Sequence, residues 1–174
     1  MRKKQLKPTL TITNIVLGIV IIFTFFAPLI TFKYTVDNKL LPFQLSGMSL
    51  LVNDTYALYV DIYDTIILKN VLFPCSIPTI LMFTCAIIAI FLPLLTMMIK
   101  KHINIEKYTY PIHSVLSLIA LIMACIVLPT YSYGKISFSM GYGLILLIIL
   151  FSANLIVSII VNLLTFNLIK INKD

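Results

Sequence analysis

Residues 136–169 read ISFSMGYGLILLIILFSANLIVSIIVNLLTFNLI, and no charged side chain interrupts these 34 residues between Lys135 and Lys170. A helix that crosses the hydrocarbon of a bilayer, about 30 Å thick, needs roughly 20 mostly apolar residues. The stretch is long enough to span a membrane, and it predicts a transmembrane helix over 139–168.

Three further charge-free stretches of similar length lie earlier in the chain. They are residues 8–32, 70–99 and 108–134. Apolar residues make up 60% of the 174 residues and charged residues only 11%, whereas about a quarter of an average soluble domain is charged. The sequence thus predicts an all-α integral membrane protein, a four-transmembrane-helix bundle that forms a single membrane domain over 1–174. The other three spans are expected near 10–32, 71–99 and 113–131.

Basic residues are divided unevenly between the two sides of the membrane that these spans define. Nine of the 13 Lys and Arg residues lie at the N-terminus, in the inner loop over 100–112 or at the C-terminus. Because basic residues accumulate on the cytoplasmic side, both termini are predicted to be cytoplasmic in a multi-pass protein of the cell membrane. The anionic inner leaflet explains the net charge of +7, so the lipid bilayer is an expected partner and nucleic acid is not.

The predicted outer loop over 33–70 is the longest segment outside the spans. Its first part has β character at 32–36 and 41–45 on either side of a turn-like segment. The short outer loop over 132–138 alternates in the same way and is expected to pair with 32–36 as a small sheet. The second part is predicted as an interfacial helix over about 53–69, with a capping Asn-Asp-Thr at its start.

Three acidic residues fall on one face of this predicted helix. Asp54, Asp61 and Asp64 occupy positions i, i+7 and i+10. They are interpreted as its solvated face and as a candidate outer contact face. A Ca²⁺ site is less favoured, because that ion wants about six to eight converging oxygens and a helix face splays its carboxylates apart.

Polar side chains form a stripe along the span at 139–168. Asn154, Ser158, Asn162 and Thr165 follow one another at helical spacing, on a face that should point into the bundle. The stripe fits either helix packing or a pathway for a small solute. Packing is favoured, because transport sites usually add an intramembrane charge and no predicted span contains one.

Two asparagines are expected to lie at the same depth in the bundle. Asn14 is seven residues from Lys7, and Asn162 is eight residues from Lys170. At 1.5 Å per residue both lie roughly 10–12 Å from the cytoplasmic boundary. We therefore predict a hydrogen bond between Asn14 and Asn162.

Two other features concern how the helices meet. Ser117, Ala120 and Ala124 form a small-residue face on which a neighbouring helix can approach closely. Pro74 and Pro78 lie one turn apart and predict a kink near the outer end of the second span.

The sequence offers no motif for catalysis, a metal or a cofactor. Cys75, Cys85 and Cys125 are odd in number and lack a C-x-x-C pair, so packing roles are favoured over a disulfide between Cys75 and Cys125. His102 and His113 both lie near the inner surface, which does not suit a haem held within the bilayer. They are expected to be interfacial polar residues.

The order of four spans, cytoplasmic termini and a longer first outer loop resembles the tetraspan arrangement of claudin-type proteins. The resemblance is one of topology and carries over no function or residue, since the tryptophan and paired cysteines of the claudin loop are absent. We expect a non-enzymatic polytopic membrane protein without a cofactor. It would act by protein–protein contact as an accessory, assembly or immunity-type subunit, with a membrane-protein partner or by self-association. The alternative is an oligomeric channel or small transporter subunit. Twelve Lys against one Arg, with many Asn and Ile, favour a bacterial source.

Overall fold

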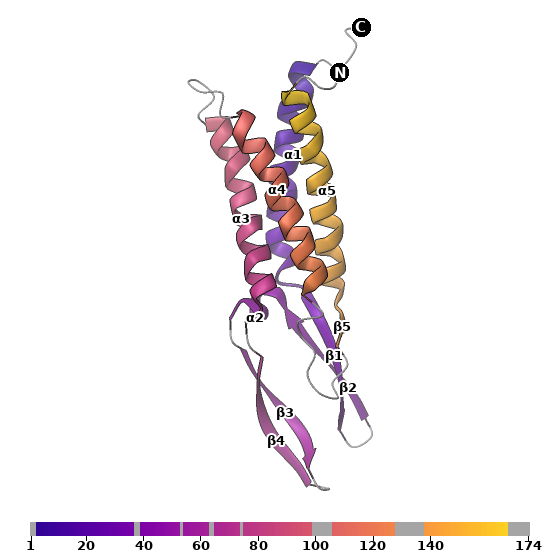
Figure 1. The fold of residues 1–174 in the computed structure, drawn as a ribbon. Helices are drawn as coiled ribbons and strands as arrows, with labels where there is room; N and C mark the ends of the chain where they lie inside the picture. Colours follow the sequence, from indigo (N-terminus) through magenta and orange to yellow (C-terminus); the bar gives the residue numbers. More distant parts are fainter. Residues whose placement is uncertain are drawn as a thin grey trace.

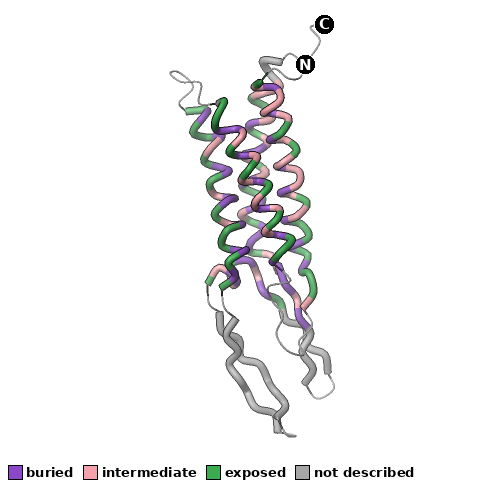
Figure 2. The backbone as a smooth tube through the Cα atoms, viewed as in Figure 1, coloured by how far each residue is buried: buried purple, intermediate pink, exposed green. Residues whose placement is uncertain are grey.

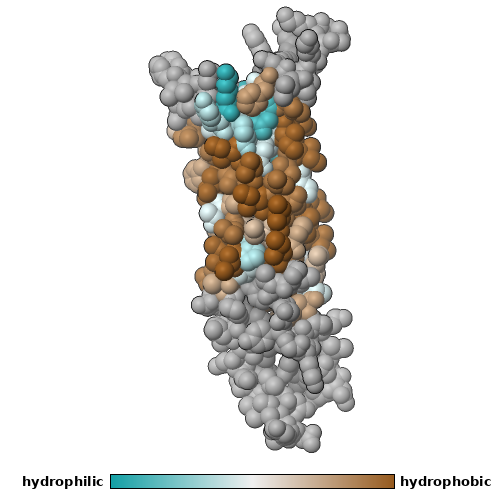
Figure 3. Space-filling model, viewed as in Figure 1, coloured by the Kyte–Doolittle hydropathy of each residue, from teal (hydrophilic) through white to brown (hydrophobic). Residues whose placement is uncertain are grey.

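A computed structural model describes residues 3–36, 39–52, 54–62, 65–73, 75–98, 106–127 and 138–166. Four long helices form one bundle (Figure 1), and these are α1 (Lys3–Thr24), α3 (Ile77–Met98), α4 (Glu106–Ile126) and α5 (Tyr142–Thr165). All four are long and apolar enough to cross a membrane, which confirms the prediction of a bundle with four such helices. Apolar residues cover most of the visible surface of the bundle (Figure 3).

The four helices are arranged so that α1 and α4 lie diagonally opposite each other. Helix α1 packs against α3 and α5, and α4 packs against the same two helices. The start of α1 and the end of α5 lie together at one end of the bundle, here called the N/C end, and the strands lie at the other, here called the hairpin end (Figure 1).

The helix boundaries differ most from the prediction at α1, which was expected over 10–32 but ends at Thr24. Tight i to i−3 hydrogen bonds at Phe25, Phe26 and Ala27 close the helix, and the residue before Pro28 is biased away from helical geometry. The apolar sequence that follows Pro28 continues as a buried strand. Helix α4 begins earlier than predicted, so 106–112 is helical and only 100–105 of the predicted inner loop lies outside the described residues.

A three-stranded antiparallel sheet caps the hairpin end in the order β2-β1-β5. Its strands are β1 (Pro28–Val36), β2 (Lys39–Ser46) and β5 (Phe138–Met140). The predicted strands at 32–36 and 41–45 are confirmed. The predicted pairing with the second outer loop is found at its last residue and just beyond it, where Phe138 to Met140 pair with Phe32 to Ile30. Residues 132–137 lie outside the described chain.

Short capping structures join the sheet to α3. Ser46 caps α2 (Gly47–Leu51) through a hydrogen bond from the Ser49 amide to its side chain at 3.1 Å. Ser76 accepts from the Thr79 amide in the same way at 3.3 Å, at the start of α3. The kink predicted from Pro78 is wrong, because Pro78 lies in the first turn of α3, where its missing N–H leaves no intrahelical bond unmade. Pro74 lies outside the described residues.

The interfacial helix predicted over 53–69 is wrong, because this part of the chain forms a β-ribbon. Strand β3 (Asp54–Ile62) pairs with β4 (Thr65–Phe73) in antiparallel register, from Asp54 opposite Phe73 to Ile62 opposite Thr65. Tyr, Val, Ile and Thr supply most of both strands, and these residue types favour a pleated surface. The one-face argument for Asp54, Asp61 and Asp64 depended on helical spacing and no longer applies, and Asp64 lies outside the described residues.

The apolar core is concentrated at the hairpin end. Its members come from the sheet and from the part of each long helix that lies nearest the strands, where Figure 2 shows purple segments. The largest fully buried side chains are Phe25, Phe32 and Phe151. Phe25 meets Phe83 edge-on, with ring centroids 4.9 Å apart. The remaining half of the bundle, from its middle to the N/C end, buries several polar side chains together with apolar ones such as Val161 and Leu164.

Candidate functional site

Helices α4 and α5 are joined by a ladder of hydrogen bonds, here called the polar ladder. Asn154 donates from Nδ2 to the hydroxyl of Ser117 at 3.0 Å. Ser158 lies 2.6 Å from the hydroxyl of Ser114, one turn nearer the N/C end. Asn154 and Ser158 are fully buried. The stripe that was expected to face the bundle interior therefore faces α4.

Asn162 lies one turn beyond Ser158 and extends the ladder by one turn toward the N/C end. Its Nδ2 donates to the hydroxyl of Ser114 at 2.6 Å and to the backbone carbonyl of Tyr110 at 3.2 Å. Thr165, the last residue of the expected stripe, only bonds the Val161 carbonyl of its own helix. The ladder is thus made by Asn154, Ser158 and Asn162 and ends before Thr165.

The hydrogen bond predicted between Asn14 and Asn162 is absent, so that prediction is wrong. The donor of Asn162 is used on α4, as described above. Asn14 is 1% exposed, and neither its Nδ2 nor its Oδ1 has a partner within the described part of the chain. Matched depth was a poor guide, because α5 turns its polar face toward α4 and not toward α1.

A second polar contact links α1 to α4 across the diagonal of the bundle. The hydroxyls of Thr11 and Tyr110 lie 3.0 Å apart and are buried. The Nζ of Lys7 lies 5.4 Å from the centre of the Tyr110 ring, within reach of a cation–π interaction. Tyrosines near span ends are usually interfacial, so the inward direction of Tyr110 could not be read from its position alone.

His113 is buried within α4, so its assignment as an interfacial residue is wrong. The ring is 1% exposed, and its Nδ1 lies 2.8 Å from the Ser158 hydroxyl. His113 falls within the part of α4 that is long and apolar enough to cross a membrane. The signal for this role was present in the sequence, because Tyr110, His113 and Ser117 recur at helical spacing. His102 lies outside the described residues.

The small-residue face on α4 lies where it was predicted. Ser117, Ala120 and Ala124 are all buried. The absence of long side chains at these positions lets a neighbouring helix approach α4 closely.

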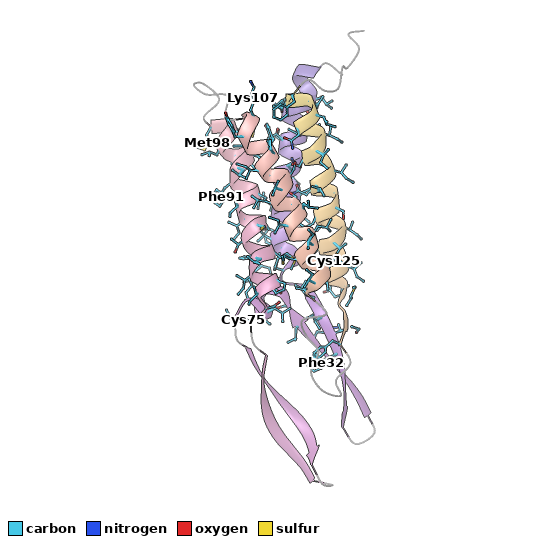
Figure 4. The ribbon with its side chains drawn as sticks, in the orientation of Figure 1. Phe32, Cys75, Phe91, Met98, Lys107 and Cys125 are labelled. Atoms are coloured by element: carbon cyan, nitrogen blue, oxygen red, sulfur yellow. The ribbon has the colours of Figure 1, made fainter. Side chains whose placement is uncertain are left out.

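No disulfide links the three cysteines. Cys85 is buried, whereas Cys75 and Cys125 are exposed near the hairpin end of α3 and α4 (Figure 4). A disulfide between Cys75 and Cys125 is therefore not formed. Across the described ranges, no group of three His, Cys, Asp or Glu residues could hold a metal ion.

The arrangement has the chemistry of a neutral hydrogen-bond network and not that of a charged centre. Its groups are amides, hydroxyls and one imidazole, and the ladder itself contains no carboxylate, lysine or arginine. Such groups fasten helices together within a bilayer. No model of a known protein family, no curated protein and no solved structure matches this chain.

Proposed function

We propose that this protein is a multi-pass protein of the cell membrane that works by contact with another protein. It would have cytoplasmic termini and would present its strands on the outer side, as the distribution of Lys and Arg favours. Its role would be that of an accessory, assembly or immunity-type subunit without enzymatic activity.

The β3–β4 ribbon is the observation that carries this proposal. It extends away from the hairpin end as a separate finger (Figure 1). In the part of the chain that is described, β3 and β4 form a two-stranded sheet with no third strand. An isolated two-stranded hairpin is at best marginally stable in water, and its two open edges can each pair with a strand of another chain.

The composition of the ribbon supports a partner. Six of the nine residues in β3 are apolar, and so are six of the nine in β4. A ribbon this apolar, projecting from a membrane bundle, is better accounted for by protein contact than by exposure to water.

The polar ladder supports a fastening role over catalysis. Asn154, Ser158 and Asn162 each bond a group on α4, which is what helix packing requires. No carboxylate lies in the sequence of α3 or α5.

Site-specific photo-crosslinking tests the proposal. A photoreactive residue at Leu58, on β3, should give one discrete adduct in intact membranes. The same residue at Phe91 is the matched control, since Phe91 is 65% exposed on the outside of α3 (Figure 4). Equal adducts at the two positions, or none at Leu58, would contradict a contact role for the ribbon.

Two further variants sharpen the experiment. When residues 54–73 are replaced with a Gly-Ser linker, the bundle should remain folded. The protein identified in the adduct should then no longer co-purify in a mild-detergent pull-down. Co-expression of two differently tagged copies separates the two kinds of partner, because an adduct that carries both tags identifies a second copy of the chain.

The alternative function, an oligomeric channel or small transporter subunit, has one observation in its favour. The bundle buries polar groups from its middle to the N/C end, including Asn154 and Ser158. At the hairpin end, however, Phe25, Leu147 and Phe151 fill the interior, so a pathway would have to form between protomers. Flux of ions or small solutes through proteoliposomes would support it.

A further inference from the structure

The five-residue helix α2 lies in a further charge-free stretch of the chain. Residues 40–53, between Lys39 and Asp54, carry no charge, and most of them are apolar. A stretch of about 10–14 such residues is too short to span a bilayer and is typical of a buried segment or of one at the membrane surface. The surroundings of α2 decide between these two.

Backbone hydrogen bonds fix the depth of α2 in the molecule. The amide of Met48 donates to the carbonyl of Phe25, just after α1, at 3.0 Å. The carbonyl of Leu50 accepts from the amide of Ser76, just before α3, at 2.9 Å. Helix α2 is thus tied to the hairpin ends of two long helices and lies level with them (Figure 1).

The same bonds suit a medium that contains no water. Hydrocarbon offers no partner to backbone N–H and C=O groups, so the protein itself must supply their partners there. Besides the two bonds to the long helices, the Ser49 amide donates to the side chain of Ser46 at 3.1 Å. Both ends of α2 are therefore bonded to protein without help from water.

The outward face of α2 is apolar. Leu50 is buried, whereas Met48 and the C-capping residue Val52 are exposed, Val52 by 60%. Phe26 and Ile77, each next to a residue that is bonded to α2, are also exposed. Exposed apolar surface therefore continues from the outer sides of α1 and α3 onto α2, and lipid that surrounds those helices reaches α2 as well.

The length of α1 favours the same placement. Its candidate span, Leu6–Thr24, has 19 residues, which is the smallest number among the four candidate spans, and it includes Lys7. At 1.5 Å per residue it is about 28 Å long, slightly less than the roughly 30 Å of hydrocarbon in a bilayer. The hydrocarbon therefore extends past the end of α1, to the level at which α2 lies.

We propose that α2 is an interfacial anchor, whose exposed residues Met48 and Val52 lie among the lipid acyl chains of the leaflet on the hairpin side. The anchor requires the membrane location proposed above, but not the contact role of the β3–β4 ribbon. Strand β3 begins at Asp54, two residues after Val52. The anchor therefore holds the base of the ribbon at the membrane surface.

Tryptophan fluorescence tests the anchor, because the chain contains no tryptophan of its own. Met48→Trp and Val52→Trp each introduce a single fluorophore into the full-length protein, which is reconstituted in phosphatidylcholine vesicles. Bromine atoms placed on the acyl chains, either near the head group or near the chain end, quench a tryptophan that they touch. Both variants should lose more fluorescence to the bromine near the head group than to the bromine near the chain end.

Two further variants calibrate the measurement. Ile88→Trp lies at an exposed position near the middle of α3, so it should lose more fluorescence to the bromine near the chain end. Leu58→Trp lies on β3, in the ribbon that extends away from the bundle (Figure 1), and should lose little to either lipid.

The outcomes separate the anchor from the membrane location on which it depends. If Ile88→Trp is quenched but Met48→Trp and Val52→Trp are quenched no more than Leu58→Trp, the anchor is overturned and the membrane location stands. If Ile88→Trp is not quenched either, both are overturned. The crosslinking at Leu58 described above tests the contact role separately.

Discussion

The half of the bundle nearest the strands packs aromatic and aliphatic side chains, whereas the half nearest the termini adds amides, hydroxyls and an imidazole to its aliphatic side chains. In the first, Phe25 and Met82 have no exposed surface. In the second, the polar ladder fastens α4 to α5. Five residues of the described chain carry buried side-chain atoms without a partner, and four of these, all except Thr79, lie from the middle of the bundle to the N/C end.

This difference indicates where the stability of the fold resides. Close packing gains many small dispersion contacts, and removing a large side chain leaves a cavity. Intramembrane hydrogen bonds contribute little on average, because the unfolded chain in the membrane also finds partners. Mutations of equal size should therefore cost more at the hairpin end than at the N/C end.

Phe25→Ala should have the largest effect. Phe25 has no exposed surface and meets Phe83 edge-on, so we expect the free energy of unfolding to fall by about 3–5 kcal/mol. Denaturant titration in mixed micelles measures it. Phe23→Ala is the control, because Phe23 lies two residues earlier, in the last turn of α1, and is 68% exposed. A comparable loss for Phe23→Ala would break the comparison.

Gly141→Ala should come next, because a methyl group at this position meets backbone. A Cβ on Gly141 would collide with the Pro28 carbonyl oxygen and lie 2.9 Å from the Leu29 carbonyl carbon. We expect a loss of about 1–3 kcal/mol and weaker pairing of β5 with β1.

The pairing of β5 with β1 can be measured by a disulfide in a background without the native cysteines. The hydroxyls of Thr31 and Ser139 lie 2.7 Å apart, so Thr31→Cys and Ser139→Cys should form a disulfide when the strands pair. Oxidation should be less efficient with Gly141→Ala than with Tyr142→Ala, a change at an exposed neighbour. Equal efficiency would show that the close approach at Gly141 is not needed.

Asn154→Leu should have a smaller effect in the polar half. It removes one hydrogen bond to Ser117, so we expect a loss of about 0.6 kcal/mol and no more than about 1.7 kcal/mol. Ser152→Ala serves as the control, because Ser152 bonds the Ile148 carbonyl of its own helix. A loss as large as that of Phe25→Ala would show that the ladder, and not the apolar core, dominates stability.

Asn14→Leu should have the smallest effect, and it should be neutral or stabilising. Both amide atoms of Asn14 are buried without a partner, so a leucine of similar size removes an unsatisfied polar group from the interior. The unfolding titration used for Phe25 measures it. A loss above about 1 kcal/mol would imply that Asn14 has a partner in the membrane.

The sequence alone predicts the number of long helices, because four stretches of 25 to 34 residues lack any charge. It does not predict where α1 ends, since the buried residues Leu29, Ile30 and Phe32 are as apolar as the helix before them. A buried strand and a buried helix segment look alike in hydropathy. Only Pro28 marks the boundary.

Side-chain partners were harder to predict than helices. The spacing of Asp54 and Asp61 fits a helical face, but the residues around them favour strands, and the strand pairing decides the outcome. The stripe from Asn154 to Asn162 was visible at helical spacing. Which helix the stripe faces could not be predicted, because the rotation of α5 depends on how all four helices pack.

The three-residue strand β5 joins parts of the chain that are far apart in sequence, with Thr31 and Ser139 separated by 108 residues. Chains are made from the N-terminus, so β1, β2 and three of the four long helices leave the ribosome before β5. Until then one edge of β1 stays open, and an open edge is a template for association with other chains. The sheet therefore closes only after β5 has emerged, and an unfinished chain differs from a finished one in a feature that other proteins can bind.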